Sequence, residues 1–173
     1  PTMRPEGMPP MLLLGVGNVN RRDDGIGPAL VTRLEADLPP FWRSAIERGD
    51  DVARLLATWE GAEGVLAIDA AVSDAPAGTF ALHAADEGWS EARSRDPSSH
   101  GFGLREAVAL SLALDTLPPT FLAASVVGVD FGHGAGLSPA LAGRLDALAE
   151  ELAGAMAGLA PTHEESRRCT KPR

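Results

Sequence analysis

The chain has 173 residues, of which 45% are hydrophobic and 23% charged, a balance that excludes a disordered, collagen-like or coiled-coil protein and fits one packed domain. Lys and Arg number 15 against 24 Asp and Glu, which gives a formal net charge of −9. Because phosphate binding needs a positive face, this charge argues against a nucleic-acid partner.

The sequence also bears on compartment and domain organisation. It contains no run of about 18 uncharged apolar residues, so we expect no membrane span. The opening PTMRPEGMPP lacks an apolar core of signal-peptide length, which predicts a cytoplasmic protein. The single cysteine, Cys169, excludes an internal disulfide framework and a cysteine metal cluster. We predict disordered extensions over residues 1–10 and 160–173 around one α/β domain over residues 11–159.

Continuous apolar runs alternate with helical patterns along the first half of the chain. The run MLLLGV, which starts at Met11, predicts a strand buried on both faces, as in a parallel sheet. Apolar residues recur with helical spacing from Ile26 until Pro39 and Pro40 end the pattern. The run VLAI predicts another buried strand, with Asp69 at its carboxyl end. The predicted strands cover residues 11–16, 41–47, 65–68 and 79–83, and the predicted helices cover 26–38 and, capped by Asp50 or Asp51, the residues up to 59.

The second half of the chain contains two notable loops. Residues 84–99 are polar and charged without periodicity, which predicts a long loop of the kind that is often functional. This loop, with Trp89, could grip a partner, or it could be an ordinary surface insertion. The glycine-rich stretch GVDFGHGAG predicts a second loop over residues 128–136. The remaining predicted elements are helices over 103–115 and, capped by Ser138, up to 159, with a strand over 121–127.

This alternation of strands and helices determines the expected fold class. Continuous apolar strands that alternate with helices predict an α/β fold, a three-layer α/β/α sandwich with a central, mainly parallel twisted sheet of about five strands. In such sheets the ligand crevice lies beyond the carboxyl ends of the strands. The loops that follow strands are therefore the places to search for chemistry.

The first such loop lies in GVGNVNRRDDGIGP, residues 15–28. The segment is not a dinucleotide fingerprint, because Asn20 stands where G-x-G-x-x-G requires its third glycine, and no Walker lysine is present. It delivers two adjacent carboxylates, Asp23 and Asp24, to the edge of the sheet. Either aspartate could simply cap the following helix, but the glycines that flank the pair also leave room for a ligand.

Two further candidates follow in the chain. Asp69 comes directly after VLAI, and a carboxylate at the end of a buried strand is costly unless it is paired, hydrogen-bonded or bound to a cation. His100, in SSHGFGL, ends the long loop just before a helix. The simpler alternatives are a turn-forming aspartate and a structural or exposed histidine. His133, between two glycines, is a lesser candidate whose simpler role is that of a surface turn residue.

In a parallel sheet, Asp24, Asp69 and His100 can converge at the carboxyl edge. Two carboxylates and one imidazole suit a borderline divalent cation and leave positions for water or substrate. These residue types do not choose among zinc, nickel, cobalt and manganese. An open position would permit Lewis-acid or activated-water chemistry, and it would equally permit recognition of a metal that a partner already holds.

The ordered set GVGN, DDGIGP, VLAIDA with APAGT, SSHGFGL and GVDFGHGAGLSPAL resembles the motifs of the hydrogenase maturation endopeptidases. These enzymes remove a C-terminal extension from the large subunit of nickel-iron hydrogenases after the metal centre is installed. The resemblance covers residues 11–159 and implies an α/β/α peptidase domain there. It also implies that Asp24, Asp69 and His100 form both the metal-binding and the catalytic set. Some relatives have Glu where Asp24 stands, and many carry a Gly-Gly-Thr turn where this chain has ERGD at residues 47–50.

The resemblance further implies the substrate and the source of the metal. The partner would be a nickel-iron hydrogenase large-subunit precursor, with no nucleic acid or membrane involved. The nickel would be supplied by that substrate, although the same ligands could accept other divalent cations. A carboxylate of the trio could act as the base for attack by water. Neither a G-x-S-x-G elbow nor a cysteine before Cys169 is present, which argues against a serine or cysteine nucleophile.

Two other classes of function remain open at this point. The same fold could act without catalysis, as a metal-sensing chaperone or checkpoint protein in hydrogenase cofactor assembly. It could also be a small amidase or aminopeptidase with its own tightly bound metal.

Overall fold

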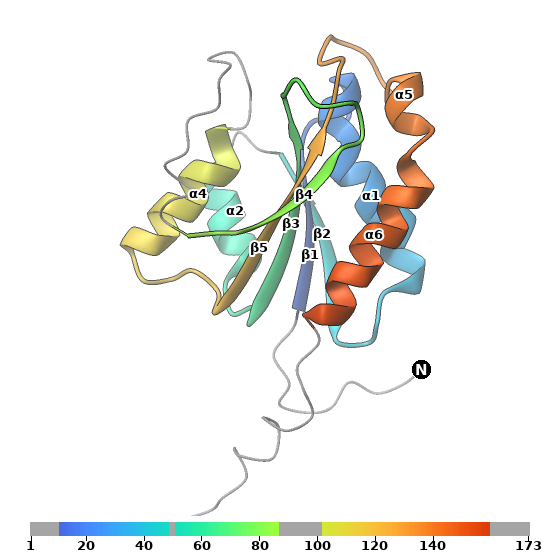
Figure 1. The fold of residues 1–173 in the computed structure, drawn as a ribbon. Coiled ribbons are helices and arrows are strands. Elements are labelled where there is room, and N and C mark those ends of the chain that lie inside the picture. Colours follow the sequence, from blue (N-terminus) through green and yellow to red (C-terminus); the bar gives the residue numbers. More distant parts are fainter. Residues whose placement is uncertain (1–10, 49–50, 87–101, 160–173) are drawn as a thin grey trace, which may run out of the picture.

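The computed structural model describes residues 11–48, 51–86 and 102–159, which form one sheet between two layers of helices (Figure 1). The strands are β1 (Met11–Val16), β2 (Trp42–Glu47), β3 (Gly64–Ala71), β4 (Phe80–Ala84) and β5 (Thr120–Val127). The helices are α1 (Ile26–Leu34), α2 (Val52–Trp59), α4 (Phe102–Ala113), α5 (Pro139–Ala142) and α6 (Leu145–Gly158), with short 3-10 turns η1 (Arg22–Gly25) and η2 (Glu35–Asp37).

The sheet of the described residues has the strand order β2-β1-β3-β5-β4. β2, β1, β3 and β5 are parallel, and β4 is antiparallel to β5. The predicted α/β/α sandwich with a mainly parallel five-stranded sheet is therefore confirmed. The chain leaves β1 towards β2 on one side and returns to β3 on the other side, so the strand order reverses between β1 and β3. Ligands of doubly wound sheets bind at such a switch point.

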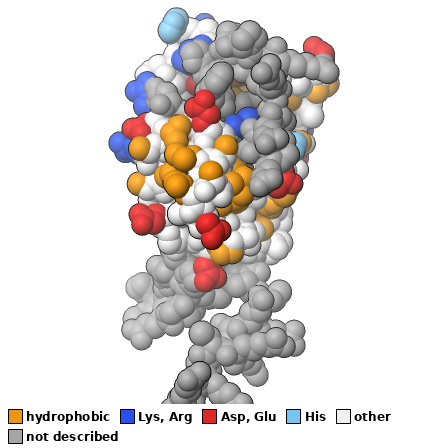
Figure 2. Space-filling view, turned by 90° about the vertical axis from the view of Figure 1, so that its left-hand side faces the viewer, with side chains coloured by type: hydrophobic (Ala, Val, Ile, Leu, Met, Phe, Trp, Pro, Cys, Tyr) orange, Lys and Arg blue, Asp and Glu red, His pale blue; other side chains and the backbone are white. Residues whose placement is uncertain are grey.

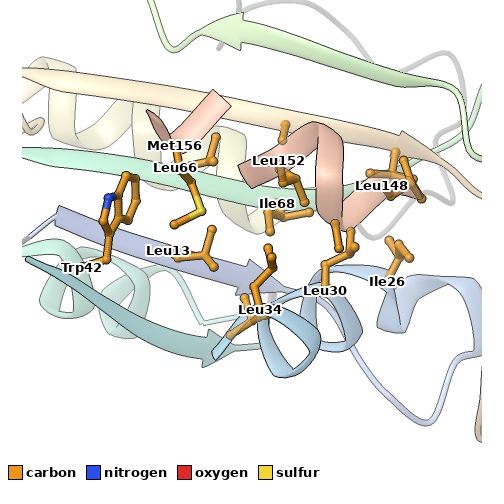
Figure 3. Packing of buried hydrophobic residues seen from close by; sticks show 14 of the residues in the cluster. Leu13, Ile26, Leu30, Leu34, Trp42, Leu66, Ile68, Leu148, Leu152 and Met156 are labelled. Carbon is orange, nitrogen blue, oxygen red and sulfur yellow. The ribbon is translucent and has the colours of Figure 1, made fainter. Parts of the chain in front are cut away.

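Each face of the sheet buries its own apolar cluster. β1 is buried at all six positions, and its residues alternate between the two faces, as the continuous apolar run predicts. On one face, Leu13 and Ile68 pack against Leu30 of α1 and Leu152 of α6 (Figure 3). On the other face, the cluster joins strand residues to α2 and α4, and Trp59 of α2 meets Phe121 edge-to-face at 5.0 Å.

Three predicted elements differ from the structure. The strand that begins with VLAI does not stop before Asp69 but runs to Ala71, because β5 continues beside it and pairs with these last residues. The helix predicted up to residue 38 ends at Leu34 and tightens into the 3-10 turn η2. The single helix predicted after Ser138 is two helices, α5 and α6, which are separated at Gly143 and Arg144.

Several predictions fall on residues outside the described part of the chain. These are the disordered extensions over 1–10 and 160–173 with Cys169, the loop from residue 87 to 99 with Trp89, and His100. Within the described ranges, none of the helices has the length and apolar character that a bilayer crossing requires.

Helix α1 lies directly against the ends of β1 and β3, and glycine makes this approach possible. A Cβ atom at Gly27 would lie 2.5 Å from the carbonyl oxygen of Val16 and 2.6 Å from that of Ile68. Both obstacles are backbone atoms of the central strands, so neither can move aside as a flexible side chain would. The close contact places the start of α1, and the loop before it, at the switch point of the sheet.

We expect the substitution Gly27→Ala to lower the free energy of unfolding by about 2–3 kcal/mol, because the added methyl forces α1 away from the sheet. Gly154→Ala in α6 is the matched control, since a Cβ atom there meets nothing within 4 Å. The control should raise stability by about 0.5–1 kcal/mol through helix propensity. Urea denaturation followed by circular dichroism measures both, and equal effects of the two substitutions would contradict the close approach.

Candidate functional site

The candidate site begins where β3 extends beyond the end of its pairing with β1. The last paired residues of β1 and β3 are Gly15 and Ile68, whereas β3 and β5 remain paired through Asp69 and Ser125 to the ends of both strands. Asp69 is therefore the first residue of β3 beyond the end of its pairing with β1, and it is half-buried. The strand order reverses at this point, so Asp69 stands in the crevice where this fold class binds ligands.

The loop after β1 brings Asp24 to the same crevice. Gly17 has a φ of +141°, and a Cβ atom there would lie 1.9 Å from the carbonyl oxygen of Asp24, so only glycine permits this turn. The backbone N–H of Asn18 donates a hydrogen bond of 2.9 Å to Oδ2 of Asp24. The position before α1 is occupied by Gly25, without any side-chain cap. The interpretation of Asp23 or Asp24 as the helix cap is therefore wrong.

Asp23 has a structural role that differs from that of its neighbour. Its fully buried carboxylate accepts hydrogen bonds from the backbone N–H groups of Val129 (2.9 Å), Asp130 (3.0 Å) and Ser138 (2.7 Å), and from the Ser138 hydroxyl (2.9 Å). Gly128 leaves room for it, since a Cβ atom there would lie 2.8 Å from the Asp23 Cβ. Burial raises the pKa of Asp23, but these hydrogen bonds outweigh it and leave the pKa below its ordinary value.

Asp69 has the opposite electrostatic situation. Desolvation, and then the negative charge of Asp24, raise its pKa to about 7 against a hydrogen bond from the Ala70 N–H and the positive charge of Arg105. Two carboxylates that repel one another in a poorly solvated crevice destabilise the fold unless a proton or a cation joins them. Groups perturbed in this way cluster at functional sites. The pair therefore has the chemistry of a cation-binding site.

Arg105 is a residue of this site that sequence reasoning missed. It lies in the first turns of α4, half-buried, and its charge acts on Asp69. Desolvation lowers the pKa of its guanidinium, and the charge of Asp69 opposes that shift. The sequence shows only that Arg105 follows Leu104 in a helix rich in Leu, Ala and Val, and the burial of Leu104 becomes visible in the structure. Such a position puts a cation at the boundary of the core rather than in open water.

The structure brings Asp24 and Asp69 together, whereas it leaves His100 untested. His100 lies outside the described residues, two positions before α4 begins. Within the described ranges, no group of three His, Cys, Asp or Glu side chains is placed to hold a metal ion. His133 is exposed in the loop after β5. His83 of β4 contacts the hydroxyl of Ser125 through Nε2 at 3.0 Å.

The two carboxylates fit part of the set that a borderline divalent cation requires. Asp24 and Asp69 supply oxygen ligands from two different elements, and their mutual repulsion would be relieved by a positive charge between them. A nitrogen ligand would complete the preferred set for nickel or zinc. The described residues thus provide two ligands, with coordination positions left for a third ligand and for substrate.

No family model matches the sequence, and no curated protein matches it either. In three dimensions, the chain is similar to the hydrogenase maturating endopeptidase HybD from E. coli, with a TM-score of 0.76 and 22% identity over 87% of this chain and 94% of that one. It is similar to the [NiFe] hydrogenase maturation protease HybD from Thermococcus kodakarensis, with a TM-score of 0.68 and 22% identity over 84% and 97% of the two chains.

A third similar structure is the [NiFe] hydrogenase maturation protease HycI from Thermococcus kodakarensis KOD1, with a TM-score of 0.62 and 21% identity over 86% of this chain and 93% of that one. The chain therefore shares the fold of the hydrogenase maturation endopeptidases across most of its length, at low sequence identity. The structural resemblance that the motifs indicated is confirmed.

The adjacent aspartates allow a matched comparison. We expect Asp23→Ala to lower the free energy of unfolding at pH 7 by about 3–5 kcal/mol, since it leaves buried donors of Ser138 and the loop after β5 without an acceptor. Asp24→Ala, one residue along, should change stability by less than about 1 kcal/mol. Urea denaturation measures both. A similar loss in the two variants would contradict the division of roles.

The pH dependence of stability tests the electrostatics of Asp69. Its folded pKa of about 7 lies above the unfolded value of 3.8, so ionisation costs stability as the pH rises between these values. We expect Asp69→Asn to match the wild type at pH 4 and to exceed it by up to about 4 kcal/mol at pH 8. Asp74→Asn, at an exposed carboxylate after β3, is the control and should shift neither end of the curve. Equal stability of wild type and Asp69→Asn at pH 8 would argue against a desolvated, repelled carboxylate.

Proposed function

We propose that this protein is an endopeptidase that removes the C-terminal extension of a nickel-iron hydrogenase large-subunit precursor after metal insertion. One observation carries the proposal: the charge of Asp24 acts on Asp69 at the switch point of the sheet, in a fold that the chain shares with the hydrogenase maturation endopeptidases. The order of the motifs along the chain supports it independently. The proposal includes a cytoplasmic location, where such a precursor would be processed.

In this proposal the nickel is part of the substrate and arrives in the precursor. Asp24 and Asp69 would supply two oxygen ligands and His100 one nitrogen ligand, and other divalent cations could occupy the same set. With a pKa of about 7, Asp69 is partly protonated at neutral pH, so cation binding displaces its proton. The site would therefore bind the metal-bearing precursor better as the pH rises through 7. Only a metal-loaded precursor brings the positive charge that relieves the repulsion between Asp24 and Asp69, so the site would distinguish it from an empty precursor.

Recognition of the metal would also position the scissile bond. Contacts from Asp24 and Asp69 on the metal-bearing segment would set the register of the chain, so that the peptide bond beyond it lies at the crevice. The bound metal supplies positive charge at that point. Water would attack the peptide carbonyl carbon while a carboxylate of the pair takes a proton from it, and the same proton would pass to the leaving amine nitrogen.

The charge of the molecule is compatible with this partner. The net charge of −9 disfavours nucleic acid and leaves a metal-bearing, cationic segment as the attractive target for the crevice. Arg105 offsets part of the negative charge next to Asp69. The crevice would therefore attract a cation without being so acidic that it repels the peptide carbonyl oxygens around it.

An intact-mass assay tests the proposal. We expect the purified protein to release one discrete C-terminal peptide from a nickel-loaded large-subunit precursor of the same genome. Asp24→Asn and Asp69→Asn should lower the rate at least about 100-fold, because each removes a charge that meets the metal. Asp74→Asn should cleave like the wild type, since its carboxylate is exposed and is not one of the proposed metal ligands.

Other outcomes would point to the alternative classes. A stable complex with a precursor of unchanged mass would contradict proteolysis and favour a metal-sensing checkpoint protein. A stoichiometric metal in the purified protein, measured by elemental analysis, together with hydrolysis of small peptides would favour an amidase or aminopeptidase. Wild-type cleavage rates in Asp69→Asn would overturn the assigned role of this residue.

A further inference from the structure

Three exposed valines lie at the same edge of the sheet as Asp24 and Asp69. Val19, Val72 and Val129 are 54%, 49% and 59% exposed, and they follow β1, β3 and β5, respectively. They account for three of the seven large hydrophobic side chains that are exposed among the described residues. Single exposed apolar residues are normal on a protein surface, but a set gathered around a candidate site indicates an interaction surface.

The topology makes the loops that carry these valines neighbours. β1, β3 and β5 are consecutive in the sheet, so each strand lies roughly 4.8 Å from the next, although β3 and β5 continue beyond the end of the pairing with β1. Val72 comes three residues after Asp69 in the chain. The backbone of Val19 lies against Gly25, next to Asp24, because a Cβ atom at Gly25 would lie 3.2 Å from the Val19 Cα. The valines therefore lie in the three loops that leave the sheet at the edge of the two carboxylates.

The loops that carry Val19 and Val129 are held in place by hydrogen bonds. The N–H of Val129 donates to Asp23 Oδ2 at 2.9 Å. Arg22 connects the two loops, since its N–H donates to the carbonyl of Gly134 at 3.0 Å and its guanidinium lies 3.3 Å from the Asp130 carboxylate. A fixed loop that exposes an apolar side chain presents a preorganised contact, which loses little entropy when a partner binds.

We infer that Val19, Val72 and Val129 form an apolar rim that contacts an apolar stretch of the precursor beside its metal-bearing segment. This inference rests on the proposed function, and it names the chemistry of the substrate at that site. The charges argue for this occupant: the carboxylates at the centre select a cation, and the uncharged valines around them match apolar neighbours of that cation. A precursor with apolar residues beside its metal would bury the apolar rim and neutralise the two carboxylates in a single binding event.

A triple Val→Thr variant at positions 19, 72 and 129 tests the rim, because threonine keeps the branched shape while adding a hydroxyl. We expect its KM for the nickel-loaded precursor to rise about 10- to 100-fold with kcat within twofold of the wild type. The reason is that the valines would contact the substrate equally in the ground state and in the transition state. The matched control replaces Leu110 of α4 and Leu114, which follows this helix, by threonine; the two side chains are 43% and 56% exposed. Figure 2 looks onto the side of the molecule that carries α4, and apolar side chains gather on this face.

The outcomes separate this inference from the proposed function. Cleavage by the wild type with an unchanged KM in the triple variant would overturn the rim alone. An equal rise in KM for the leucine control would also overturn it, because binding would then not be confined to the strand ends. A wild type that neither binds nor cleaves the precursor would overturn the proposed function and the rim with it. Self-association of the wild type that the triple variant abolishes, measured by light scattering, would assign the valines to a second copy of the chain instead.

Discussion

The candidate site depends on one buried carboxylate. Asp23 accepts hydrogen bonds from Val129, Asp130 and Ser138, which lie more than 100 residues away in the chain. These bonds attach the loop after β1 to the loop after β5 and to the start of α5. Because the donors satisfy the carboxylate fully, its charge stabilises the fold although it is buried. The positions of Asp24, Val19 and Val129 follow from this anchor, since they lie in the loops that it joins.

The adjacent aspartates illustrate how a fold separates stability from function. Asp23 is surrounded by donors, and its pKa is lowered, whereas the charge of Asp24 acts on Asp69 and raises the pKa of that residue to about 7. A fold selected for stability alone would not place Asp24 and Asp69 together at a desolvated strand end. The energetic cost of this pair is the physical reason to assign it a ligand. Under the proposed function that ligand is the nickel of the precursor, because the fold shared with hydrogenase maturation endopeptidases does not by itself determine function.

Much of the architecture could be predicted from the sequence, because it depends on local patterns. The apolar run from Met11 predicts a strand buried on both faces, and β1 is the central example. Features that depend on distant partners could not be predicted in the same way. The extension of β3 past Asp69 is decided by pairing with β5, and the break between α5 and α6 interrupts a pattern that is helical on both sides. Arg105 was missed for the same reason, since only the packing of α4 on the sheet brings its charge to Asp69.

The candidate site was predictable only in part. The rule that ligands bind beyond the carboxyl ends of parallel strands selected Asp24 and Asp69, and the structure places them at the switch point. The different roles of Asp23 and Asp24 could not be read from two identical neighbours, because the donors that distinguish them come from the loop after β5 and from Ser138. The contribution of His100 stays a prediction, since it lies outside the described residues.

The electrostatic coupling between Asp24 and Asp69 is the central feature of the candidate site. The measurement that tests it is an NMR titration of the side-chain carboxyl carbon of Asp69 in the wild type and in Asp24→Asn, without metal. We expect a pKa of about 7 for Asp69 in the wild type and a lower pKa for Asp69 in Asp24→Asn, where the negative charge of Asp24 is removed. An ordinary aspartate pKa in the wild type, or a raised pKa that Asp24→Asn leaves unchanged, would contradict this coupling.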